Sequence, residues 1–98
     1  MVTIKVNALV SSCVTNDDGK VVSKAIRQGL DACDSVTLDF FGIDTVSTSF
    51  VNSSIIVLLD DFDVEAIKGR MLITRASKQI GNMIKMRVSS ESLLHTNV

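Results

Sequence analysis

Six hydroxyl side chains gather within ten residues of this sequence, in the segment TVSTSFVNSS at positions 45–54. The segment directly follows the apolar run VTLDFFGI, so the hydroxyls are expected where a strand ends and a helix begins. One Ser or Thr oxygen at such a place caps the helix by accepting a hydrogen bond from a free backbone N–H, which contributes about 1 kcal/mol. A single cap does not account for Ser47, Thr48 and Ser49 together.

Phosphorylation is the second chemistry open to these three side chains. A phosphoryl group on Ser47, Thr48 or Ser49 would add about −1.5 to −2 charges at the turn. The first turn of a helix favours negative charge, because its unpaired N–H groups and its dipole converge there. The sequence therefore leaves two interpretations open: helix capping alone, or a phosphorylation switch that changes a docking surface.

The rest of the sequence does not predict catalysis. The single histidine, His95, lies close to the C-terminus, and neither GxGxxG nor GxxxxGK occurs. Asp60, Asp61 and Asp63 could bind Mg²⁺ through their carboxylates, but such a run is more often the solvated end of a helix. We therefore expect a protein that is not an enzyme and that carries neither a cofactor nor a metal.

The two cysteines, Cys13 and Cys33, have no CxxC spacing and no neighbouring histidine. They predict two buried, reduced thiols rather than a disulfide or a metal site. The first residues, MVTIKVNALVSS, lack the pattern of a signal peptide, and no apolar run approaches the length of a membrane-spanning helix. We expect a cytoplasmic protein without a membrane partner.

Charge divides the chain into two parts that nearly cancel, for a net charge of −1. Residues 1–63 carry nine Asp against four Lys or Arg, whereas residues 64–88 carry six basic residues against one Glu. The basic residues of the second part are Lys68, Arg70, Arg75, Lys78, Lys85 and Arg87. They are dispersed and no aromatic residue lies among them, which disfavours nucleic acid as a partner.

Hydrophobic periodicity predicts strands that alternate with helices. The expected elements are a strand at 2–10, a helix capped by Asp17 or Asp18 and ending near Cys33, a strand at 35–40, a helix at 49–60, a strand at 70–74 and a helix at 77–88 capped by Ser77. This β-α-β-α-β-α order favours an α/β fold with a parallel or mixed sheet and helices packed on it. We expect a single domain over 1–88 and an unstructured or short edge tail over 89–98.

Two stretches resemble a known family. VTLDFFGIDTVSTSFVNSSIIVLL resembles the central motif of STAS domains, the fold of bacterial anti-sigma-factor antagonists, and is closer still to a STAS-like family of uncharacterised function. GKVVSKAIRQGL resembles the first helix of that STAS-like family. By position, the phosphorylated hydroxyl of the antagonists falls on Thr48, with Ser47 in place of the preceding Asp and Phe50 in place of a Gly.

The resemblance implies a STAS-like fold and a regulatory module that docks on a protein, such as a histidine-kinase-like ATPase acting as a Ser/Thr kinase. Helix 49–60 and the turn before it would form the contact. The expected contact residues are Asp44, Phe50, Asn52 and Ser53. The alternative is a constitutive assembly module, for example a homodimer, in which the hydroxyls only cap the helix. Binding of a small nucleotide or lipid at the turn is a third class, which no residue specifically indicates.

Overall fold

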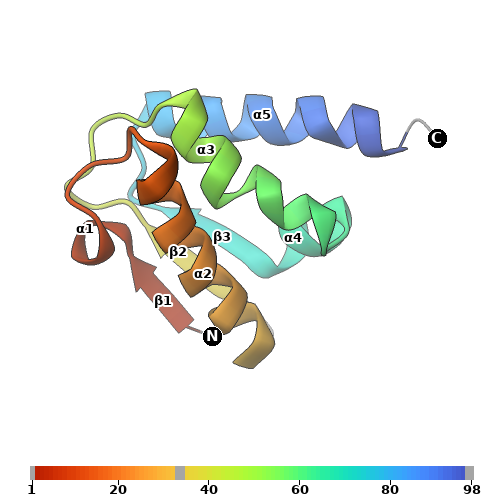
Figure 1. Cartoon of the computed structure of the whole chain (residues 1–98), viewed down its shortest axis with the longest axis horizontal. Helices are drawn as coiled ribbons and strands as arrows, with labels where there is room; N and C mark the ends of the chain where they lie inside the picture. The colour runs from red at the N-terminus through yellow and green to blue at the C-terminus, as the bar shows by residue number, and fades with distance from the viewer. Residues whose placement is uncertain (1, 33–34, 97–98) are drawn as a thin grey trace.

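The computed structural model describes residues 2–32 and 35–96, and the side chains of those up to residue 90. The chain forms a parallel sheet with helices packed on it (Figure 1), which confirms the predicted α/β class. The elements in chain order are β1 Val2–Lys5, α1 Val6–Leu9, α2 Asn16–Ala32, β2 Val36–Asp39, α3 Thr48–Ser54, the 3₁₀ helix η1 Ile56–Asp60, α4 Val64–Arg70, β3 Met71–Thr74 and α5 Lys78–Thr96.

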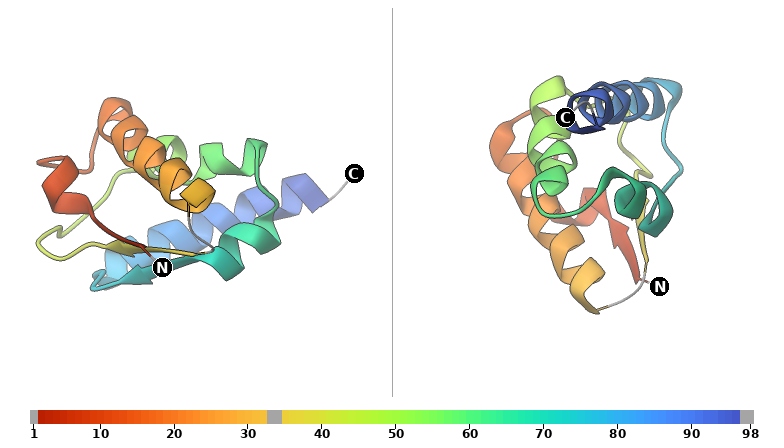
Figure 2. Two further views of the ribbon diagram at one scale, coloured as in Figure 1. Left: turned by 90° about the horizontal axis from the view of Figure 1, so that it is seen from below. Right: turned by 90° about the vertical axis from the view of Figure 1, so that its right-hand side faces the viewer.

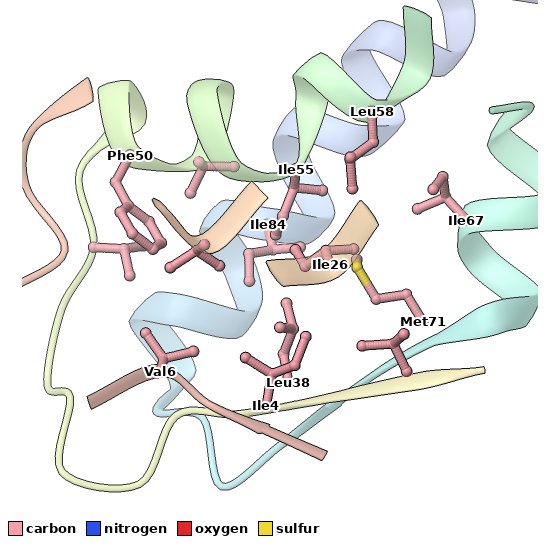
Figure 3. Close-up of a cluster of buried hydrophobic side chains, with 14 of the residues drawn as sticks. Ile4, Val6, Ile26, Leu38, Phe50, Ile55, Leu58, Ile67, Met71 and Ile84 are labelled. Atoms are coloured by element: carbon pink, nitrogen blue, oxygen red, sulfur yellow. The ribbon is translucent and has the colours of Figure 1, made fainter. Parts of the chain in front are cut away.

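The sheet has three strands in the order β1-β2-β3, so each crossover steps in the same direction. Right-handed crossovers that keep one direction place every intervening helix on the same face of a sheet. In Figure 3 the strands lie on one side of the buried side chains, and α3 and η1 lie on the other. The side chains of Ile4, Leu38 and Met71 point into this core and are buried.

The opposite face of the sheet is mostly polar. In the strand register, Thr3 lies beside Thr37 and Thr37 beside Leu72, and the next row contains Lys5, Asp39 and Thr74. Thr3, Lys5 and Leu72 are exposed. Parallel sheets usually have both faces covered, whereas here hydroxyls and charges make a one-sided sheet compatible with water.

The strand predicted over 2–10 is wrong beyond Lys5, where β1 ends. The residues that follow form the helix α1, although they continue the alternating pattern. The ladder between β1 and β2 stops at the pair of Lys5 and Asp39, so the following residues have no strand beside them. The chain turns instead into α1, where the N–H of Val10 donates to the Val6 carbonyl at 3.1 Å. Val6 remains fully buried, which explains its place in the apolar pattern.

The second half of the chain departs from prediction in helix bounds. The helix expected at 49–60 is two elements, α3 and η1, and α4 was not predicted because its seven residues are too few to show a clear period. The helix expected at 77–88 continues as α5 to Thr96, through most of the segment expected to be a tail, and residues 97 and 98 lie outside the described ranges. No helix within those ranges is long and apolar enough to cross a membrane.

One of the two predicted helix caps is confirmed and the other is wrong. Ser77 caps α5 as expected, since its Oγ accepts from the Ile80 N–H at 3.3 Å. The cap of α2 is Thr15 rather than Asp17 or Asp18. The Thr15 Oγ1 accepts from the Asp18 N–H at 3.1 Å, and the Asp18 carboxylate accepts from the Thr15 N–H at 3.4 Å, so the two residues form a reciprocal capping box.

Helices α2 and α3 lie side by side over the sheet (Figure 2). Their contact depends on Gly19, because a Cβ at that position would lie 2.8 Å from the Phe50 carbonyl oxygen and 2.1 Å from the Ser53 Oγ. The backbone oxygen cannot move away without shifting α3. The glycine therefore determines how closely the start of α2 approaches α3.

We expect Gly19→Ala to lower the free energy of unfolding by about 1–3 kcal/mol, because the added methyl group overpacks this contact. Gly81→Ala is the matched control, since a Cβ there meets nothing within 4 Å and alanine should stabilise α5 by about 0.5–1 kcal/mol. Urea denaturation of both variants measures the difference. Equal stability of Gly19→Ala and the original chain would contradict the close contact.

Candidate functional site

The hydroxyl-rich segment lies at the carboxyl end of β2, in the turn that leads into α3 (Figure 1). The turn begins with a hydrogen bond from the Ile43 N–H to the Phe40 carbonyl at 2.9 Å. Gly42 within it has a φ of +83°, and a Cβ there would lie 2.9 Å from the Asn7 Nδ2. Glycine thus satisfies both the backbone conformation and the limited space.

The start of α5 holds the turn from one side. The Gln79 side chain binds the backbone of Val46 twice: its Oε1 accepts from the N–H at 3.0 Å and its Nε2 donates to the carbonyl at 3.1 Å. The Ser77 Oγ donates to the Asp44 carbonyl at 2.8 Å. Val46 itself is buried, so both the backbone and a side chain of the turn are fixed.

Ser47 holds the turn from the other side and caps α3. Its N–H donates to the Cys13 carbonyl at 3.0 Å, and its Oγ donates to the Val14 carbonyl. The same Oγ accepts from the Phe50 N–H at 3.0 Å, the bond expected of an N-cap. The hydroxyl of Ser47 is therefore engaged both as donor and as acceptor.

The other two candidate hydroxyls are more open. Thr48 and Ser49 are both exposed in the first turn of α3. The Thr48 Oγ1 lies 3.8 Å from the Met83 Sδ, a weak acceptor. Among the contacts of the described residues, the Ser49 hydroxyl makes no hydrogen bond.

The later polar residues of α3 serve the helix and its packing. The Ser53 Oγ donates to the Ser49 carbonyl and the buried Ser54 Oγ to the Phe50 carbonyl, both at 2.7 Å. The Asn52 Oδ1 accepts from the Arg87 Nε at 3.0 Å, which joins α3 to α5.

The predicted contact residues therefore differ in how much surface they offer to a partner. Phe50 is 0% exposed and belongs to the core (Figure 3), so its ring does not offer a partner any surface. Asp44 is exposed, and Asn52 and Ser53 are partly buried. The backbone geometry brings Ser47, Thr48 and Ser49 together on one turn, with Asp44 three residues before it.

An ion pair lies beside the turn. The Asp39 Oδ1 accepts from the Phe41 N–H and from the Arg75 Nε, both at 3.0 Å. The second carboxylate oxygen accepts from the Arg75 Nη2. Sequence reasoning missed this partner, because Arg75 directly follows Thr74 and only the strand register places Thr74 beside Asp39.

Arg75 also covers an exposed ring. Its guanidinium lies 4.8 Å from the ring centroid of Phe41, which is 60% exposed. Arg75 adopts a φ of +53°, uncommon for a residue other than glycine. The hydrogen bonds and the charge of Arg75 hold the pKa of the Asp39 carboxyl below its usual value. Together these contacts tie the end of β2 to the end of β3.

The remaining sequence candidates do not form a reactive centre. Burial, with a smaller effect from Asp18, raises the pKa of the Cys13 thiol to about 11, so this buried thiol stays protonated at neutral pH. Cys33 lies outside the described residues. Asp61 forms an ion pair with Arg27, and within the described part of the chain no three His, Cys, Asp or Glu side chains gather as metal ligands would.

A family model described as a STAS-like domain of unknown function (DUF4325) matches residues 18–80. The chain belongs to this family. The matched region of the STAS-like domain begins in the first turn of α2 and ends in the first turn of α5. It therefore contains the whole turn between β2 and α3. Searches of curated proteins and of solved structures found no match.

The Asp39–Arg75 pair should make the stability of this STAS-like domain depend on pH. The folded-state pKa of Asp39 is lowered, so the stabilisation is fully present above the unfolded value of about 3.9 and is lost as the pH falls through the folded-state value. We expect Asp39→Asn to lower the urea midpoint near neutral pH and to flatten its fall in acid. Asp44→Asn is the control and should leave the neutral midpoint unchanged. An unaltered acid profile in Asp39→Asn would contradict the role of the pair.

Proposed function

We propose that this STAS-like domain is a non-enzymatic, cytoplasmic regulatory module that docks on a protein partner through α3 and the turn before it. Phosphorylation of Ser49 is the proposed switch. The observation that carries the proposal is the contrast among three neighbouring hydroxyls: the Ser47 hydroxyl is fully used by the fold, while the exposed Ser49 hydroxyl has no hydrogen bond among the described contacts.

The anchored turn supports a switch that acts on the surface rather than on the fold. The turn is fixed by Gln79 and Ser77 on one side and by the Cys13 and Val14 carbonyls on the other. A phosphoryl group transferred from ATP to the Ser49 oxygen would add negative charge and three acceptor oxygens to a rigid surface. The surrounding backbone would not have to move for a partner to sense the change.

Ser49 is a better acceptor than the residue suggested by the resemblance. Thr48 occupies the position of the antagonists' phosphorylated hydroxyl, but its Oγ1 already faces the Met83 sulfur. Phosphorylation of Ser47 would remove its donation to Val14 and disturb the cap, so it would cost stability. We therefore rank Ser49 first, Thr48 second and Ser47 last.

The proposed partner is a protein, such as a histidine-kinase-like ATPase that acts as a Ser/Thr kinase, in keeping with the resemblance to anti-sigma-factor antagonists. Asp44, Asn52 and Ser53 would surround the contact. The competing proposal, a constitutive homo-oligomeric assembly module, uses the same hydroxyls as helix caps only. The two proposals differ in what an acidic residue at position 49 should do.

We expect Ser49→Asp to abolish the association of the domain with its protein partner in host cells, because it places a permanent charge on the docking surface. Thr3→Asp is the matched control, since Thr3 is an exposed hydroxyl residue on the open face of the sheet, outside the turn and α3. Quantitative mass spectrometry of proteins crosslinked to each variant, expressed at native level, measures the association.

A constitutive assembly module predicts another result. Ser49→Asp would then leave the crosslinked proteins and the mass of any oligomer in light scattering the same as in Thr3→Asp. Ser47→Ala separates capping from switching, because it should lower stability by about 1 kcal/mol and leave partner association intact.

A further inference from the structure

A shallow groove of about 230 Å³ runs between α2 and the helices that follow the hydroxyl turn. Helix α2 contributes four side chains to it, and α3 and η1 contribute one each. The lining residues are Lys20, Ser23, Lys24, Arg27, Ser53 and Val57. The groove therefore combines a row of cations with two hydroxyls and a single apolar residue.

The cations form a stripe along one face of α2. Lys20, Lys24 and Arg27 are spaced by four and three residues, which places them on successive turns of the same face. The residues three and four positions from Lys24 are Lys20, Val21, Arg27 and Gln28, so no acid within α2 can pair with it. Like charges at this spacing destabilise a helix slightly, and the fold does not benefit from the row.

Of the three cations in the stripe, only Arg27 at its C-terminal end forms an ion pair with a described residue. Arg27 forms an ion pair with Asp61 and donates to the Val57 carbonyl at 3.4 Å. Lys20 and Lys24 are exposed and make no ion pair with any described residue. These two ammonium groups lie in the part of the chain, residues 1–63, that otherwise carries mostly acidic side chains.

The groove is connected to the proposed switch. Ser53, which lines the groove, donates from its Oγ to the Ser49 carbonyl at 2.7 Å. The two residues are one helical turn apart, a rise of about 5–6 Å, which is shorter than the distance over which salt screens charge in cells, about 8 Å. A phosphoryl group on Ser49 would thus be sensed at the end of the groove.

We propose that this groove, which we call the α2–α3 groove, binds an acidic segment of the protein partner, whose carboxylates pair with Lys20 and Lys24. The inference rests on the proposed function and adds the chemistry of the partner to it. Two exposed cations without an ion pair among the described residues complement a short run of Glu or Asp. Phosphorylated Ser49 repels such a segment, which gives the switch its direction: the unmodified domain binds and the modified one releases.

Other occupants fit less well. Nucleic-acid surfaces concentrate more positive charge and stacking aromatic side chains, whereas this groove has two unpaired cations and no aromatic residue. A second copy of the chain would have to use an acidic surface of its own, and Asp61 of the acidic run is already paired with Arg27. These occupants are outcomes of the test below.

The test is an NMR titration of the ¹⁵N-labelled full chain with a blocked hexaglutamate peptide at an ionic strength of about 0.05 M, where surface charges are little screened. We expect amide shifts along Lys20–Arg27 and Ser53–Val57. Lys20→Glu/Lys24→Glu should weaken binding by about tenfold or more, because two attractions become repulsions. Both substituted side chains are exposed, and Lys20→Ala/Lys24→Ala provides a milder second variant.

Lys68→Glu/Lys85→Glu is the matched control. Each double substitution changes the net charge from −1 to −5, because every Lys→Glu exchange alters the charge by two. Lys68 and Lys85 line a different, mostly apolar pocket between α4, β3 and α5, so binding there should change by less than about twofold if the effect is local. Ser49→Asp should weaken peptide binding in the same direction as the groove variants.

Three results would overturn the inference: no shifts, shifts spread evenly over all basic residues, or equal losses in the two double variants. Tighter binding of a single-stranded oligonucleotide of equal charge, or self-association that Lys20→Glu/Lys24→Glu abolishes, would assign the groove to a different occupant. Failure here is distinguishable from failure of the proposed function. If the peptide does not bind while Ser49→Asp still abolishes partner association, the proposed role of the groove is wrong and the proposed switch is retained. If the peptide binds while Ser49→Asp leaves partner association unchanged, the role of the groove is retained and the switch is wrong.

Discussion

The fold depends on one topological constraint: three parallel strands follow one another across the sheet in chain order. Right-handed crossovers then place the helices between the strands on a single face, where α2 packs against α3. Helix α5, which follows the last strand, packs against α3 as well. Gly19 allows α2 to approach α3 closely. The other face carries threonines that can remain in water and the Asp39–Arg75 pair, in which the exposed Arg75 covers a buried carboxylate.

The same constraint builds the candidate site. The connections after β1, β2 and β3 all leave from the carboxyl edge of the sheet, so the turn before α3 lies between the other two. One neighbour supplies the carbonyls of Cys13 and Val14, and the other supplies Ser77 and Gln79. Among the hydroxyls of the segment, that of Ser47 holds this arrangement, while those of Ser53 and Ser54 bond within α3. Ser49 is exposed on a turn that the fold has already fixed, which separates the chemistry of a modification from the stability of the domain.

Local patterns in the sequence predicted the parts of the fold that depend on local physics. The strand β2 follows from alternation, β3 from a short apolar run, helix α2 from helical spacing and the Ser77 cap from cap chemistry. The strand expected to reach residue 10 failed because its length depends on where the neighbouring strand ends, which alternation does not encode. The hydrogen bonding of the Gln79 side chain to the Val46 backbone joins residues 33 positions apart, so no local sequence pattern predicts it. The difference between Ser47 and Ser49 likewise depends on the distant Val14 carbonyl.

The most direct measurement is a phosphorylation map of the intact protein isolated from its own host cells under several growth conditions. The account predicts a phosphoryl group on Ser49 in a fraction of the molecules, and none on the structurally engaged Ser47. A chain that carries no phosphate under any condition, or one modified mainly at Ser47, would contradict the claim that this turn displays Ser49 as the acceptor for regulation.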